Sequence, residues 1–162
     1  MRTVLIAFDG SADAEGVVRR VVREARGDGI DRIHLLNVQT PLGGYVSQFV
    51  GSRTVREFQR DAGEAALAVG KRLLDMAGCD YRTHVRIGDA AKTILRTAVE
   101  LGVSQIVMGT GGPGLLARLA QYLLIARVIR RAAVPVVILA AAQDAFARPL
   151  PVGGPGSTAL RS

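Results

Sequence analysis

The chain has 162 residues, of which 49% are hydrophobic and 22% are charged, which is enough for one domain with a substantial buried core. The net charge of +7 favours anionic partners, but with only 4% aromatic residues and no recognition-helix or zinc-finger pattern we do not expect nucleic acid. Polar residues interrupt every apolar run, and the N-terminal run reaches Asp9 too soon for a signal peptide, so we expect a cytoplasmic protein without membrane association.

The first part of the chain alternates between strand and helix patterns. Residues 3–8, TVLIAF, form a continuous apolar run that ends at Asp-Gly-Ser, which is typical of a strand buried on both faces. Residues 12–26 carry apolar side chains at helical spacing, with Ser11 as the N-cap. Residues 32–38 predict a second strand. Residues 39–53 predict a loop of unusual length, and such loops are often functional.

The alternation continues to the end of the core. The remaining elements are expected as helix 54–77, strand 81–87, helix 90–101, strand 105–109, helix 115–132 and strand 134–140. Asp89 is placed to cap the helix that starts at residue 90. This order predicts right-handed βαβ units on a parallel sheet, a doubly wound α/β sandwich. We expect one domain over residues 1–143 and a disordered tail, rich in Pro and Gly, over residues 144–162.

The stretch GTGGPG, residues 109–114, follows the fourth predicted strand. A dinucleotide-binding loop has the same G-x-G-x-x-G spacing, but it follows the first strand and needs an acidic residue about 20 positions later, which this chain lacks. A P-loop needs Lys and Ser or Thr where Leu115 and Leu116 stand. Two interpretations stay open: free amides at a helix N-terminus hold a phosphate, or the glycines only let the chain turn.

We find no pattern that places catalytic or metal-binding groups together. Cys79 is the only cysteine, which excludes an intramolecular disulfide and a cysteine-based zinc site. His34 and His84 lie far apart in apolar runs and form a pair only if the fold joins them, so we interpret them as structural. With no nucleophile–base–acid constellation and no paired carboxylates, we expect no catalytic residue, no metal and no enzyme activity.

Some segments together resemble the universal stress protein family: VLIAFDGS at the first strand, VSQIVMGTGG at the fourth, and RVIRRAAVPVVIL at the end of the core. The resemblance covers about residues 2–140. It implies a three-layer sandwich with a five-stranded parallel sheet, Rossmann-like and similar to the adenine nucleotide alpha hydrolases. It also implies a homodimer that pairs the last strands edge to edge, through Val134, Val136, Val137 and Ile138. An apolar edge strand needs covering in any case.

The phosphate motif of the family's ATP-binding branch is only half present. That branch carries G-x-x-G, nine residues, and then G-[S/T]; Gly109 and Gly112 match the first half, but Tyr122 and Leu123 replace the second. The replacement fills space that phosphate oxygens need and removes a hydrogen bond worth ~1.5–3 kcal/mol. The Tyr122 hydroxyl offers a partial substitute. The surrounding helix is so apolar that both side chains are expected to pack, against a partner in one interpretation.

By the same resemblance, the adenosine half of the family's site is better preserved in this sequence than the phosphate half. It places Ala7, Phe8 and Asp9 beside the base and ribose, Val38 against the adenine through its backbone, and Met108 and Gly109 along the ribose. The full candidate set for nucleotide binding is Ala7, Phe8, Asp9, Val38, Met108, Gly109, Gly112 and Gly114. Asp9 has a competing role, because Asp-Gly-Ser is also a strand-ending turn.

Two functions therefore stay open. The first is a non-catalytic stress-response homodimer with a degenerate ATP-phosphate motif, which acts through protein partners or an unidentified ligand. The second is a regulatory switch that binds ATP or AMP, with slow ATP hydrolysis, in which Arg118 and the glycine-loop amides replace the lost residues. A nucleotide that co-purifies with the protein favours the second, and dry packing around Tyr122 favours the first.

Overall fold

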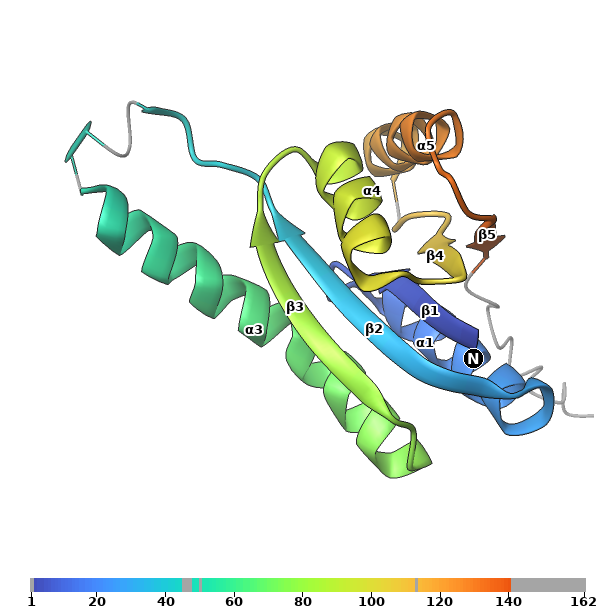
Figure 1. Ribbon diagram of the computed structural model, residues 1–162. Helices are drawn as coiled ribbons and strands as arrows, with labels where there is room; N and C mark the ends of the chain where they lie inside the picture. Colours follow the sequence, from blue (N-terminus) through green and yellow to red (C-terminus); the bar gives the residue numbers. More distant parts are fainter. Residues whose placement is uncertain (1, 45–47, 50, 113, 141–162) are drawn as a thin grey trace, which may run out of the picture.

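The computed structural model describes residues 2–44, 48–49, 51–112 and 114–140 (Figure 1). The described helices and strands are, in chain order, β1 (Arg2–Ala7), α1 (Ala12–Asp28), β2 (Ile30–Gln39), α3 (Ser52–Ala77), β3 (Tyr81–Ile87), α4 (Ala90–Leu101), β4 (Gln105–Gly109), α5 (Leu115–Ile129) and β5 (Val136–Leu139). Strands and helices alternate as the sequence predicts. The expected tail, residues 144–162, lies outside the described residues, so its disorder stays a prediction.

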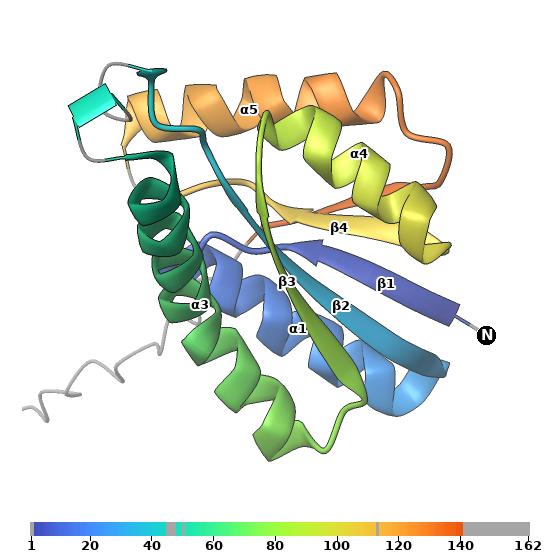
Figure 2. The same ribbon diagram turned by 60° about the vertical axis from the view of Figure 1, so that its left-hand side comes forward.

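The strands form one parallel sheet in the order β3-β2-β1-β4-β5. Helices α1 and α3 cover one face, and α4 and α5 cover the other (Figures 1 and 2). The predicted doubly wound α/β sandwich is confirmed. The winding direction reverses next to β1, because the chain moves from β1 outward to β3 and then returns to add β4 on the opposite side.

The core lies in two layers, one on each face of the sheet. Val4 and Ile6 of β1 pack toward α1 and α3, while Leu5 between them packs toward α4 and α5. All three side chains are fully buried. A strand covered on both faces has no solvent side, which explains why its sequence is continuously apolar rather than alternating.

The predicted helix starts are confirmed by their capping contacts. The Ser11 hydroxyl accepts a hydrogen bond from the Ala14 amide at 3.2 Å, and the Asp89 carboxylate accepts one from the Lys92 amide at 3.0 Å. These bonds satisfy amides that have no partner within the helix. No helix among the described residues is both long enough and apolar enough to cross a membrane.

The last two elements are shorter than the sequence pattern predicts. Helix α5 ends at Ile129 instead of residue 132, and β5 begins at Val136 instead of residue 134. Pro135 explains the late start of the strand, because proline has no amide hydrogen to donate to a neighbouring strand. Its carbonyl still accepts from the Ile106 amide at 2.9 Å, so pairing with β4 begins there.

Helix α3 packs closely on the sheet through two buried glycines, Gly63 and Gly70. A Cβ atom added at Gly70 would lie 2.6 Å from the Leu35 Cδ2 atom and 3.2 Å from the Phe8 Cζ atom. The glycine therefore sets how near α3 approaches β2, and it also helps to position Phe8 at the end of β1.

We expect Gly70→Ala to destabilise the protein. The cost of overpacking, ~1–3 kcal/mol, outweighs the gain in helix propensity of about 1 kcal/mol at a position with no free space. Gly27→Ala in α1 is the matched control, because a Cβ there meets nothing within 4 Å; it should stabilise by roughly 0.5–1 kcal/mol. Urea unfolding followed by circular dichroism measures both. Equal stabilisation by the two substitutions would contradict the close packing of α3.

Candidate functional site

A cleft opens at the carboxyl ends of β1, β2 and β4, between the starts of α1 and α4 and the middle of α5. It lies where the strand order reverses, and this is the place where open α/β sheets bind their ligands. Apolar side chains line most of it, with a small number of polar groups among them. That composition is typical of a site for a small organic ligand.

The cleft gathers most of the predicted site residues. Its lining includes six of them: Ala7, Phe8, Asp9, Val38, Met108 and Gly109. The other two predicted residues, Gly112 and Gly114, do not belong to the lining. The strand ends thus converge as the sequence suggests, while Gly112 and Gly114 lie outside the lining of the cleft.

Asp9 forms the turn that the sequence proposes and still faces the cleft. Its Oδ1 atom accepts a hydrogen bond from the Ser11 amide at 2.9 Å, and Gly10 between them has a φ of 83°. The residue remains exposed and lines the cleft. A role in the turn and a contact with a ligand are therefore compatible.

Sequence reasoning missed Asn37, which holds the end of β1 in place. Its side chain is 2% exposed, and its Nδ2 atom donates to the Phe8 carbonyl at 2.9 Å. Its Oδ1 atom accepts from the Gln39 side chain at 2.6 Å. A buried amide with both ends bonded fixes the surrounding backbone. The available signal was an uncharged polar residue inside an apolar strand.

Sequence reasoning also missed Gln121, which lies beneath the glycine loop. Its Nε2 atom donates to the Gly109 carbonyl at 2.8 Å. A Cβ on Gly111 would lie 2.8 Å from the Gln121 Cβ atom, and Gly111 has a φ of 97°. Only glycine meets both the close approach and the left-handed backbone there. The loop thus rests directly on α5.

Tyr122 and Leu123, the departures from the phosphate motif, do not line the cleft. They are 67% and 55% exposed. Gln121 and Leu124 line it instead, so Gln121 rather than the Tyr122 ring occupies the inner side of the loop. The helical repeat explains why Tyr122 and Leu123 lie outside the cleft, because positions 121, 124, 125 and 128 share the inward face of α5.

An ion pair beside the cleft joins α4 to α5. The Nη2 atom of Arg127 lies 2.8 Å and 3.0 Å from the two carboxylate oxygens of Asp89. The Lys92 amide and then the Arg127 guanidinium lower the pKa of Asp89 by hydrogen bonding to its charged form. Arg127 is thereby partnered by a carboxylate of the chain itself.

A model of the Universal stress protein family matches residues 1–140 of this sequence. The chain belongs to the universal stress protein family. No curated protein matches it. Among solved structures it is similar to a universal stress protein in complex with cAMP, at 21% identity and a TM-score of 0.65 over 85% of this chain and 96% of that one.

Two further universal stress proteins have the same fold. The protein UspA from Lactobacillus plantarum is 18% identical, with a TM-score of 0.67, over 85% of this chain and 97% of that chain. A protein from Archaeoglobus fulgidus in complex with dAMP is 20% identical, with a TM-score of 0.54, over 85% and 97% of the two chains. These likenesses establish the fold.

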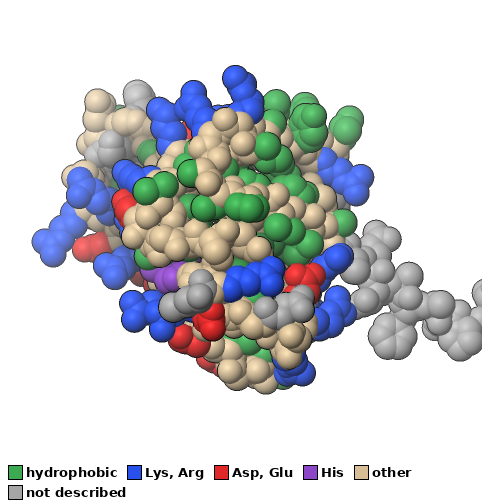
Figure 3. Space-filling view, turned by 45° about the vertical axis from the view of Figure 1, so that its right-hand side comes forward, with side chains coloured by type: hydrophobic (Ala, Val, Ile, Leu, Met, Phe, Trp, Pro, Cys, Tyr) green, Lys and Arg blue, Asp and Glu red, His purple; other side chains and the backbone are tan. Residues whose placement is uncertain are grey.

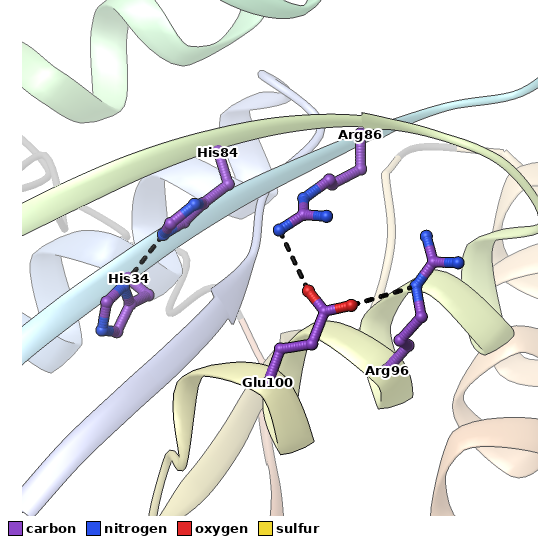
Figure 4. A network of polar contacts seen from close by, with 5 residues as sticks. All are labelled: His34, His84, Arg86, Arg96 and Glu100. Carbon is purple, nitrogen blue, oxygen red and sulfur yellow. Dashed lines mark hydrogen bonds and ion pairs between the residues drawn. The ribbon is translucent and has the colours of Figure 1, made fainter.

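In this universal stress protein the fold does join the two histidines, on β2 and β3. The His34 Nδ1 and His84 Nε2 atoms are 2.9 Å apart (Figure 4). Neither ring lines the cleft. No group of three or more His, Cys, Asp or Glu side chains among the described residues is placed to hold a metal ion. The pair thus bridges two strands of the sheet.

The charge state of this pair depends on its surroundings. Burial lowers the pKa of both rings, and positive neighbours, including Arg86 beside His84, lower them further. Arg86 itself bonds Glu100 at 3.1 Å, and Glu100 also pairs with Arg96 at 3.4 Å (Figure 4). One ring nitrogen must accept in the shared hydrogen bond, so at least one ring stays neutral.

We expect the pair to make stability depend on pH just below neutrality. The pKa values are lowered in the folded protein, so the unfolded chain binds protons first as the pH falls below the ordinary histidine value of 6.5. The stability that the neutral histidine pair contributes is fully present above that pH and is lost as the pH falls below it. Melting temperatures from about pH 7.5 to 5.5 should fall for the wild type and fall less steeply for His84→Gln. Parallel curves would show that the pair does not carry the effect.

Proposed function

We propose that this universal stress protein is a non-catalytic, cytoplasmic stress-response protein that binds an AMP-type nucleotide in the cleft. The supporting observation is the convergence of Ala7, Asp9, Val38 and Met108 at the point where the strand order reverses. Proteins of the same fold and family have been solved with cAMP and with dAMP, which supports this class of ligand.

The backbone of Val38 supports recognition of a base. The Leu36 carbonyl bonds the Phe8 amide on the β1 side, and the Gln39 carbonyl bonds the Gly88 amide on the β3 side. Because backbone groups of successive residues alternate in direction along a strand, the Val38 amide and carbonyl face the β1 side. Strand β1 has already ended at Ala7, so these groups lie open at the cleft.

The side chains around Val38 suit an adenosine. Ala7, Ile94, Met108 and Leu124 supply apolar surface for a flat base. The Asp9 carboxylate is an acceptor for the hydroxyls of a ribose. This combination matches the base and sugar of the proposed ligand.

We expect Asp9→Ala to weaken AMP binding about tenfold or more, because a hydrogen bond to a charged group is worth ~1.5–3 kcal/mol. Glu24→Ala is the matched control, since Glu24 pairs with Arg20 farther along α1 and does not line the cleft. Isothermal titration calorimetry with AMP measures both affinities. Absence of AMP binding to the wild type at millimolar concentration would refute the proposed function.

We also propose that the chain forms a homodimer through the β5 edge, with the outer face of α5 beside it. Strand β5 is the last in the sheet and pairs with β4 alone among the described strands. The outer face of α5 carries several exposed large apolar residues: Leu115, Leu116, Leu119, Tyr122, Leu123 and Ile129. Hydrophobic side chains gather at the upper right and centre of Figure 3, and α5 lies at the upper right of Figure 1. A helix that is apolar on both sides is normally covered on both.

We expect a dimer at about 50 μM by sedimentation equilibrium, because burial of such a face favours association by roughly 25 cal/mol per Å2. The double substitution Leu119→Glu and Leu123→Glu should shift the protein to monomer. Met76→Glu on α3 is the control, since Met76 is an even more exposed apolar residue on another face. A monomeric wild type would refute the dimer, and a dimeric double variant would restrict the interface to the β5 edge.

A further inference from the structure

We propose that the cleft selects adenine ligands with at most one phosphate and discriminates against polyphosphates, so that AMP binds more tightly than ATP. This inference rests on the proposed function and assigns a ligand class to the same site. It follows from the charges of the groups that line the cleft, from the packing of the glycine loop and from the position of the nearby cations outside the cleft.

The cleft of this basic protein is acidic. Asp9 and Asp13 both line it, and no lysine or arginine belongs to its lining among the described residues. A chain of phosphates would bring several negative charges toward two carboxylates without a cation to compensate them. Like charges repel each other more strongly in a partly enclosed site than in open water.

Asp13 lines the cleft on the side of the glycine loop. A Cβ on Gly109 would lie 3.1 Å from the Val17 Cγ2 atom, so this face of α1 touches the start of the glycine loop. Asp13 is one helical turn before Val17 and therefore shares that face. Asp13 lines the cleft together with Ala7 and Phe8 from the end of β1 and Gly109 and Gly111 from the loop.

The N-terminus of α1 does not offset this charge. The Ser11 hydroxyl already accepts from the Ala14 amide at 3.2 Å, which occupies one of the amides that an anion would use. Asp13 and Glu15 both lie in the first turn, where they neutralise the positive end of the helix. The helix end that faces the cleft is thus already matched with negative charge.

The glycine loop also offers little to a phosphate chain. The Gln121 side chain packs against Gly111 and bonds the Gly109 carbonyl, and of the glycines only Gly109 and Gly111 line the cleft, while Gly112 does not. The nearby cations line a separate hollow formed by Lys92, Arg127, Arg130 and Arg131 with Ala91 and Leu95. Arg127 is bonded there to Asp89. These four cations therefore lie outside the lining of the cleft.

The experiment compares adenosine, AMP and ATP by calorimetry on the full chain, without Mg²⁺, at about 50 mM and about 300 mM salt. We expect AMP to bind at least about tenfold more tightly than ATP, and the ratio to shrink at the higher salt because screening weakens repulsion. Asp13→Asn should bring the ratio down about threefold or more and leave the adenosine affinity unchanged. Glu15→Gln, in the same turn but outside the cleft lining, should leave the ratio as it is.

The outcomes separate this inference from the proposed function. ATP that binds as tightly as AMP, or a ratio that neither Asp13→Asn nor salt changes, overturns the selectivity while nucleotide binding stands. Failure of adenosine, AMP and ATP alike to bind overturns the proposed function itself. The salt dependence is measured on the wild type, so the test does not depend on how well Asp13→Asn folds.

Discussion

The need to cover both faces of a parallel sheet is the constraint on which the rest of this structure depends. Strands such as β1 are apolar on both sides, so the chain must place helices on both, and it does so by reversing its winding direction once beside β1. At the reversal the loops after β1 and β4 diverge to opposite faces. The cleft between them follows from the topology, before any particular side chain is considered.

Close packing then shapes that opening. Gly70 lets α3 press against Leu35 and Phe8, and the bonds from Asn37 hold the carbonyl end of β1. On the other side, Gln121 fastens the glycine loop to α5. These contacts place the cleft on rigid elements, which is how a site keeps a defined geometry without a ligand.

The charge of the cleft is opposite in sign to the net charge of the molecule. The chain carries a net charge of +7, yet the cleft is lined by carboxylates while several of the cations gather in a separate hollow beside α4 and α5. Net charge therefore misrepresents the field that a ligand meets in this site. In the same way α5 presents an apolar face to solvent as well as one to the sheet, so its overall hydrophobicity does not identify the face that packs.

Local patterns in the sequence were sufficient to determine the order of the elements, the caps at Ser11 and Asp89, the family and most of the strand-end residues of the site, because each depends on neighbours in the chain. Only the tertiary structure decided that His34 meets His84, that Asp13 enters the cleft, and that Gln121 rather than Tyr122 lies under the glycine loop. The first depends on which strands pair. The position of Asp13 depends on how α1 packs beside the sheet. The position of Gln121 depends on the rotation of α5 about its axis, and because α5 is apolar on both sides it carries no periodic signal to fix that rotation.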